Sequence, residues 1–176
     1  KFYSFGREQE ISGKYLEAIP FLQKALEFDA EFASVYTQLA VIYVNTNQWK
    51  LAKENATKAF ELKDSVGESE KLRISYFYYA VVTGEMDRAI STLELWRRTY
   101  TSTVAPYVNL ADCYMRLGQF ERAVTVCREA LGSTNAASAV LYANLAESLL
   151  SLGRFDEVKE TCREAFARNF DSDIFR

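Results

Sequence analysis

The sequence predicts an all-α protein, a right-handed superhelical solenoid of five antiparallel helix-turn-helix hairpins. Three observations lead to this prediction. A similar segment recurs along the whole chain at a nearly constant interval, each copy contains stretches with the apolar spacing of an amphipathic helix, and a turn residue separates these stretches. A hairpin of this kind cannot bury its apolar face alone, so tandem copies stack on one another.

The interval is clearest in the second half of each copy. These segments begin at a turn residue, carry an aromatic residue or Met two positions later, and reach a small residue three positions beyond that. The small-residue anchors are Ala18, Ala52, Ala89, Ala123 and, in the last copy, Val158, with separations of 34, 37, 34 and 35 residues. We therefore expect a single array over residues 1–176, with copies at 1–32, 33–66, 70–103, 104–138 and 139–172.

A second helix precedes each turn. The stretches SVYTQLAVIYVNT from Ser34, APYVNLADCYMRL from Ala105 and VLYANLAESLLSL from Val140 align without gaps. Their common skeleton is an aromatic residue followed by a Leu-Ala pair, Tyr36/Leu39/Ala40, Tyr107/Leu110/Ala111 and Tyr142/Leu145/Ala146. The first copy departs from this skeleton, with Phe2, Phe5 and Gly6 in the same places. The glycines at the turns fit the left-handed conformation that ends a helix.

The third copy is ambiguous on local grounds. Its segment ISYFYYAVV is rich in β-branched and aromatic residues, which favours a strand. Its register favours a helix, because Tyr76 and Phe77 fall on the Leu-Ala pair and Gly84 and Ala89 follow on schedule. We expect a helix, with the three extra residues of this copy in the polar segment KDSVGESE before it.

Composition excludes several functions. The chain has no histidine, a net charge of −3 and three cysteines without CxxC spacing, so we expect no catalytic residues, no cofactor-binding residues and no metal site. The charge lacks the basic excess needed for nucleic-acid binding. The longest strongly apolar run, Tyr76 to Val82, is too short for a membrane span. We expect the cysteines of the two equivalent slots, Cys127 and Cys162, to be buried, and Trp49 to pack in the core.

The aromatic-x-x-Leu-Ala pattern, followed by Gly-x-aromatic-x-x-Ala, resembles that of tetratricopeptide (TPR) repeats over the whole chain. The segments SGKYLEAIPFLQKALEFD and LYANLAESLLSLGRFDEVKETCREAFARNFDS further resemble the repeat regions of acidobacterial serine/threonine protein kinases and related regulators. This resemblance implies a non-catalytic accessory or sensory region of a bacterial signalling protein, cut from a longer chain. Kinase activity would belong to another domain, since no glycine-rich loop, HRD or DFG motif is present.

The resemblance also implies a peptide-binding groove lined by the first helix of each hairpin. The sixth position of every copy is polar and uncharged, which suggests a ladder of side chains that could pair with an extended peptide. The alternative is that these residues are solvated or bond across adjacent helices. The expected groove residues are Gln38, Ser75, Tyr78, Asn109, Asp112, Arg116, Asn144 and Glu147. The two-carboxylate clamp that some TPR proteins use is absent, because the fifth positions carry no Lys or Arg.

The predicted function is therefore binding of a protein or an extended peptide. A competing hypothesis is self-association, with a homodimer formed through a terminal repeat, because the final helix over residues 155–167 has an apolar face with no capping helix after it. Unpaired cysteines favour a cytoplasmic location. An extracytoplasmic one would follow if the parent protein carried a membrane-spanning helix.

Overall fold

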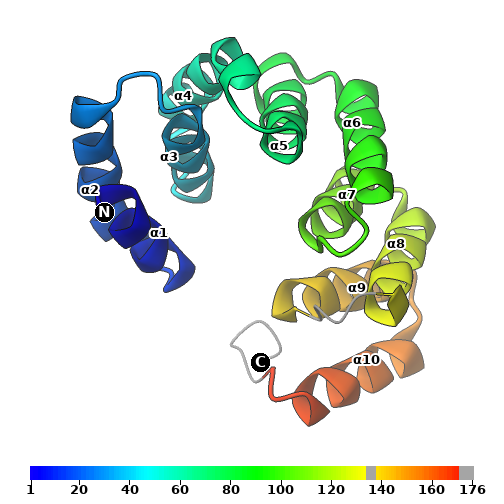
Figure 1. The fold of residues 1–176 in the computed structure, drawn as a ribbon. Coiled ribbons are helices and arrows are strands. Elements are labelled where there is room, and N and C mark those ends of the chain that lie inside the picture. Colours follow the sequence, from blue (N-terminus) through cyan, green and yellow to red (C-terminus); the bar gives the residue numbers. More distant parts are fainter. Residues whose placement is uncertain (134–137, 171–176) are drawn as a thin grey trace. The chain divides into compact units, whose positions relative to one another are not determined.

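The protein is described by a computed structural model that covers residues 1–133 and 138–170, and within these residues every regular element is helical (Figure 1). The contacts group the chain into two compact units, residues 1–92 and residues 93–176. The boundary falls inside one helix, α6 (Met86–Thr99). Each unit is built from hairpins, which confirms the all-α fold class, whereas the right-handed superhelical path and the single array remain predictions.

The first unit begins with two helical hairpins. Helices α1 and α2 form the first hairpin and α3 and α4 the second, and both pairs lie side by side in Figure 1. A short 3-10 helix and a fifth α-helix follow, and the latter runs directly into a π-helical turn. The bounds are α1 (Phe2–Ile11), α2 (Tyr15–Phe28), α3 (Ala33–Asn45), α4 (Trp49–Glu61), η1 (Lys63–Ser65), α5 (Glu68–Tyr78) and η2 (Tyr79–Thr83).

The second unit holds two further hairpins after the end of α6. Helix α7 packs against α8, and α9 packs against α10. Contacts between α7 and α9 join the first helices of these two hairpins, and contacts between α8 and α9 extend the same interface. The bounds are α7 (Ala105–Arg116), α8 (Phe120–Ser133), α9 (Ala139–Ser151) and α10 (Phe155–Ala167).

The turn inside each of the five predicted hairpins contains a left-handed residue, as the sequence predicts. Four of these residues are glycines, with φ between 70° and 74°, and the fifth is Asn47 with φ 57°. Asparagine tolerates this conformation better than most side chains do, because its short polar side chain bonds locally. The left-handed residue reverses the chain within a few residues, which keeps the two helices of a hairpin in contact.

The core of the first unit depends on the close approach of small residues. Ala18, Leu22 and Ala25 of α2 form one buried cluster with Leu39 and its neighbours on α3 and with Ala52 of α4. Ala18 and Ala52 are both fully buried. Because α2 contacts α3, this cluster lies at the interface between two repeats.

The third copy is helical, which confirms the prediction from register over the one from local propensity. The sequence did not predict that the helix ends in a π-turn.

An arginine–tyrosine contact recurs in the third and fourth copies. In the third copy Arg88 lies 4.1 Å from the ring centre of Tyr79 and donates to its hydroxyl at 2.9 Å. In the fourth, Arg122 lies 4.2 Å from the ring of Tyr114 and donates to its hydroxyl at 2.9 Å.

The two contacts are equivalent although the tyrosines are not in the same register. Each arginine follows its turn glycine, Gly84 or Gly118, by the same spacing, but Tyr79 precedes its glycine by one residue more than Tyr114 does. A π-turn closes between residues i and i+5 instead of i and i+4. The turn at Tyr79–Thr83 therefore brings Tyr79 to the place that Tyr114 has in an α-helix.

One packing expectation is wrong. Trp49, which we expected in the core, keeps 49% of its surface exposed. It is the first residue of α4. Trp96, in contrast, is buried in the second unit.

The contact between α1 and α2 yields a test of this packing. A Cβ at Gly6, which replaces the alanine of the Leu-Ala pair, would lie 2.7 Å from Cδ2 of the fully buried Leu22. We expect Gly6→Ala to lower the free energy of unfolding by about 1–3 kcal/mol through overpacking. Gly132→Ala is the control, since nothing lies within 4 Å of its Cβ, and it should stabilise α8 by about 0.5–1 kcal/mol. Urea denaturation measures the free energy of unfolding of both variants. A change of the same sign in the two variants would contradict this packing.

Candidate recognition face

The second unit carries a polar stripe on α7. Asn109, Asp112 and Arg116 are spaced by three and four residues, so they lie on one face of the helix. The side chains of Asp112 and Arg116 are 60% and 48% exposed, and their nearest charged atoms are 4.0 Å apart. An exposed pair at this distance contributes little to stability. Both groups therefore remain available to a ligand.

The surroundings of Asp112 shift its ionisation. Although most of the side chain is exposed, partial desolvation by neighbouring atoms raises the pKa of Asp112, and the charge of Arg116 lowers it by less. The net result is a pKa above that of an ordinary aspartate. A cationic group bound beside Asp112 would favour its charged form and lower this pKa again.

The neighbouring helix α9 adds Asn144 and Glu147 to the same surface. Asn144 Nδ2 donates a hydrogen bond to the carbonyl oxygen of Val108 on α7 at 3.3 Å. This is the alternative to a peptide-binding ladder described above, because the Asn144 amide bonds across adjacent helices. Among the described residues the side chain of Asn109 makes no such bond, and Glu147 is exposed. We call Asn109, Asp112, Arg116, Asn144 and Glu147 the recognition face.

The groove residues expected in the first unit are less accessible. Gln38 is only 4% exposed, which argues against a direct ligand contact. The Ser75 hydroxyl donates to the carbonyl of Lys71 one turn earlier, at 2.7 Å. The Tyr78 ring stacks on Phe60 of α4 with centres 4.0 Å apart. In this unit both α5 and the π-turn that follows it contact α4.

A charged cluster in the first unit was missed at the sequence level. Arg73 takes the place that tyrosine has in three other copies, and its Nε and Nη2 donate to the carboxylate of Glu70 at 2.8 and 2.5 Å. Desolvation raises the pKa of Glu70, but the hydrogen bond and charge of Arg73 outweigh it, so the net pKa is lowered. Ser34 lowers this pKa further. In the sequence, the one signal for this cluster was a charged residue at a repeat position that is aromatic in the other copies.

A shallow hollow of about 480 Å³ lies against α1 in the same unit, lined by Tyr3, Ser4, Arg7, Glu8 and Ser12. Arg7 forms no ion pair within 4.0 Å with any residue that the structure describes, although its charge acts on Glu10 and Glu70. The lining holds one basic side chain, Arg7, and one acidic side chain, Glu8, so the hollow is electrostatically mixed.

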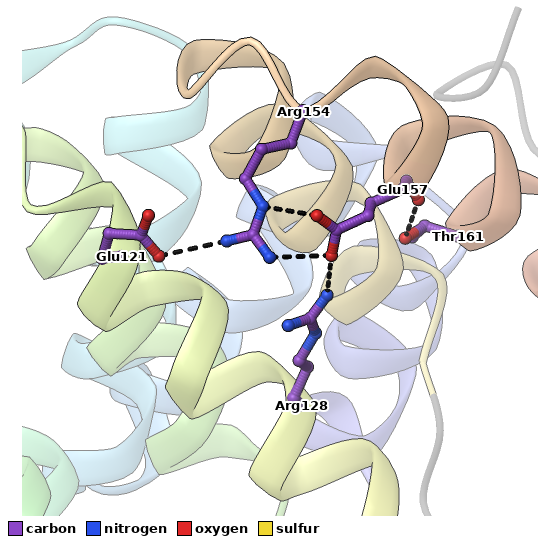
Figure 2. A network of polar contacts seen from close by, with 5 residues as sticks. All are labelled: Glu121, Arg128, Arg154, Glu157 and Thr161. Atoms are coloured by element: carbon purple, nitrogen blue, oxygen red, sulfur yellow. Dashed lines mark hydrogen bonds and ion pairs between the residues drawn. The ribbon is translucent and has the colours of Figure 1, made fainter.

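Figure 2 shows a network that ties α10 to α8 in the second unit. Arg154, which precedes α10, donates to both carboxylate oxygens of Glu157 at 2.5 and 2.7 Å and to Glu121 of α8 at 3.1 Å. Arg128 of α8 donates to the same Glu157 carboxylate. The hydroxyl of Thr161 donates to the backbone carbonyl of Glu157 at 2.8 Å. Hydrogen bonds from Arg154 and then Arg128 lower the pKa of Glu157 to about 2.

The cysteines and acidic residues form no metal site in the parts of the chain that the structure describes, where no group of three or more potential ligands is placed to hold an ion. Cys113 and Cys127 are buried, and desolvation raises their pKa values to about 11 and about 12. Cys162, expected to be buried like Cys127, is only half-buried. Within residues 1–133 and 138–170, no helix is both long and apolar enough to cross a membrane.

A family profile described as tetratricopeptide repeat matches residues 33–65, 104–136 and 139–172, which together make up more than half of the chain. The chain belongs to the TPR family. The matched segments coincide with the second, fourth and fifth expected copies. The first and third copies are the two whose skeletons depart most from the repeat, with Gly6 and Arg73 among the substitutions.

Solved TPR structures have the same fold. A thermophilic TPR protein of Thermus thermophilus, TTC0263, matches with a TM-score of 0.80 and 18% identity over 99% of this chain and 93% of that one. A TPR protein of Parabacteroides merdae matches with a TM-score of 0.75 and 13% identity over 99% of this chain and 66% of that one. YrrB, described as a TPR protein with an unusual peptide-binding site, matches with a TM-score of 0.55 and 16% identity over 99% and 88%.

At these identities the likeness shows the fold alone. No relative of significant similarity is found among the curated proteins.

The network between these two TPR repeats predicts a pH dependence. The folded-state pKa of Glu157 is depressed from 4.5 to about 2, so its charge stabilises the fold above pH 4.5, and this contribution is lost as pH falls from 4.5 towards 2. We expect Glu157→Gln to lower the Tm at neutral pH, with the difference from wild type shrinking below pH 4.5. Circular dichroism melts over a pH series measure this. Glu160→Gln, whose partner Arg163 lies on the same helix, is the control. A Tm difference that stays constant down to pH 2 would contradict the role of Glu157.

Proposed function

We propose that this chain is a non-catalytic TPR module that binds a protein or an extended peptide on the recognition face of its second unit. The observation that carries the proposal is the arrangement on α7. There Asn109, an amide without a partner among the described residues, lies in one stripe with Asp112 and Arg116, two exposed charges. Family membership supports the proposal, since TPR repeats generally mediate protein–protein or peptide interactions.

The chemistry of the face favours one class of ligand. An amide side chain such as that of Asn109 offers both donors and an acceptor to the backbone of an extended peptide. Asp112 and Glu147 supply two exposed carboxylates against the single cation Arg116. A peptide with a basic residue beside an exposed stretch of backbone therefore matches the face. The peptide-binding site in the description of YrrB is a property of that protein, and it lends support by analogy only.

Helix α9 has a supporting role in this proposal. The Asn144 amide holds α9 against the Val108 carbonyl and leaves its own oxygen for a ligand. Three residues of the first unit are kept in the proposal as further contacts of the ligand, although burial and stacking make their side chains less accessible. They are Gln38, Ser75 and Tyr78.

We further propose that the module is an accessory region of a bacterial signalling protein, such as a serine/threonine kinase, and that it resides in the cytoplasm. The resemblance of its repeats to those of acidobacterial kinases supports the first point. Free thiols at Cys113, Cys127 and Cys162 support the second. The identity of the parent protein can be tested by reading the coding sequence before Lys1. A kinase catalytic domain there is the expected result. An uninterrupted secretory leader there would contradict the cytoplasmic assignment.

Peptide selection followed by calorimetry tests the recognition face. A displayed library of unstructured peptides is expected to yield binders enriched in Lys and Arg. Asn109→Ala should weaken the selected peptide about threefold to tenfold, as expected for one or two lost hydrogen bonds. Asp87→Asn is the control, because Asp87 is an exposed carboxylate on α6 outside the face. Equal affinity of wild type and Asn109→Ala would remove Asn109 from the site.

The raised pKa of Asp112 adds a pH signature to the same measurement. Because a basic group stabilises the ionised form, affinity should fall as pH drops through the raised pKa of Asp112. In Asp112→Asn the peptide should bind more weakly at neutral pH, and this part of the pH dependence should disappear. An unchanged pH profile in the variant would show that Asp112 does not contact the basic residue.

A further inference from the structure

The recognition face carries the same chemistry on two neighbouring helices. Asn109 and Asp112 on α7 are followed 35 residues later by Asn144 and Glu147 on α9. This interval is the one between the small-residue anchors of the fourth and fifth copies, so the two pairs occupy the same repeat positions. Each helix thus presents an amide and, three positions further on, a carboxylate. A ligand that crosses both helices meets the same two groups twice.

The carboxylate sets these two copies apart from the rest of the chain. At its position the first three copies have Arg7, Val41 and Tyr78. In the second unit, by contrast, Asp112 and Glu147 are both exposed acids. Opposite charges attract at short range, so this unit is suited to a ligand with a cationic group opposite each of the two helices.

A hydrogen bond sets the register of the two helices. Asn144 Nδ2 donates to the carbonyl oxygen of Val108, the residue before Asn109, at 3.3 Å. Helices α7 and α9 are both first helices of hairpins, so they run in the same direction. Each carboxylate lies three residues, about 4.5 Å, further along its helix than the asparagine. Asp112 and Glu147 therefore lie side by side, and the axes of packed helices are about 8–10 Å apart.

The exposure of these carboxylates is a property of the repeat position. Helix α7 is followed by a complete hairpin, and it contacts both α8 and α9. The Asp112 side chain is nevertheless 60% exposed. Glu147 has the same place on α9 and is exposed as well. A following hairpin therefore does not cover this position, and the accessibility of Glu147 does not depend on where the array ends.

The separation of the two helices selects a backbone conformation for the ligand. In polyproline II, side chains three residues apart point in the same direction, and they are about 9.3 Å apart along the chain. In a β-strand, side chains on one side are two residues apart, at about 6.5 Å, or four residues apart, at about 13 Å. Only the polyproline II spacing falls within the distance of about 8–10 Å between packed helices.

We propose that the recognition face binds an extended peptide in the polyproline II conformation that carries two basic residues three positions apart. One basic side chain pairs with Asp112 and the other with Glu147. The Asn109 amide bonds to the peptide backbone. This ligand class rests on the proposed function, because it specifies the peptide that the same face binds.

Arg116 makes the two acidic positions unequal. It lies one turn beyond Asp112 on α7, and the nearest charged atoms of the two side chains are 4.0 Å apart. The residue at the same position of α9 is Ser151, which is uncharged. A lysine beside Asp112 is therefore repelled by Arg116, whereas a lysine beside Glu147 meets a serine at that position. Glu147 is the stronger of the two acceptors.

Calorimetry of the full chain with synthetic peptides tests the spacing. The probes are proline-rich peptides of equal length with two lysines placed two, three or four positions apart, and a further peptide with one lysine. The peptide with spacing three should bind about threefold to fivefold more tightly than the other two-lysine peptides, because it forms one more exposed ion pair. These peptides have the same composition and charge, so a nonspecific attraction does not distinguish them. Added salt should weaken the binding, since exposed charges are screened.

Three variants and a control assign the basic residues to their acceptors. In Glu147→Gln the preference for spacing three should disappear, because one of the two acceptors is lost, and Asp112→Asn should have the same effect. Arg116→Ser copies the residue of α9 and should tighten the spacing-three peptide about threefold, a gain that a loss of folding does not produce. Asp156→Asn is the control and should bind as wild type does, since its side chain is 99% exposed on α10 outside the face.

The outcomes separate this ligand class from the proposed function. Equal affinity for the three two-lysine peptides would overturn the ligand class, as would tightest binding at spacing two, which is the spacing of a β-strand. A preference for spacing three that persists in Glu147→Gln would overturn the pairing. If no lysine peptide binds but a peptide selected from the library does, the ligand class is wrong and the proposed function stands. If the library yields no binder either, both fail.

Discussion

The stacking of one hairpin on the next through small, fully buried residues is the constraint on which the rest of this structure depends. Ala18, Ala52, Ala89 and Ala123 are all completely buried. A larger side chain at such a place would separate the helices, since protein interiors tolerate little extra volume. Where this close approach holds, the first helices of adjacent hairpins come near enough for Asn144 to reach the carbonyl of Val108.

The same constraint separates residues that pack from residues that recognise. Positions that face the next hairpin are filled by alanine, leucine and cysteine, and burial keeps thiols such as Cys127 in the neutral form at ordinary pH. Positions that face away are free to differ between copies. The α7 stripe of Asn109, Asp112 and Arg116 differs in this way. The recognition that we propose therefore relies on side chains that the repeat pattern does not constrain.

Helical repeats with left-handed turns follow from the sequence because they depend on contacts between neighbours in the chain. In the third copy, the register of Gly84 and Ala89 correctly predicted a helix, although the residue composition favours a strand. The accessibility of the expected groove residues was predicted less well. Asn109, Asp112 and Glu147 lie in accessible places, whereas Gln38 is buried and Tyr78 is stacked on Phe60. The stacking partner of Tyr78 lies on α4 and the π-turn follows Tyr78 directly, and neither feature leaves a periodic signal in the sequence.

The sequence by itself determined the hairpins, their turns and the small-residue anchors, because each is a local requirement of helix geometry and close helix contact. Only the tertiary structure decided which polar side chains are used inside the protein and which remain for a partner. Asn109 and Asn144 occupy the same repeat position, yet only Asn144 finds a carbonyl within reach. Among the residues that the structure describes, Arg128 bonds to Glu157 of the next copy, whereas Arg163, at the same repeat position, bonds to Glu160 of its own helix. The distinction depends on which helix lies opposite, and that is a property of the folded chain.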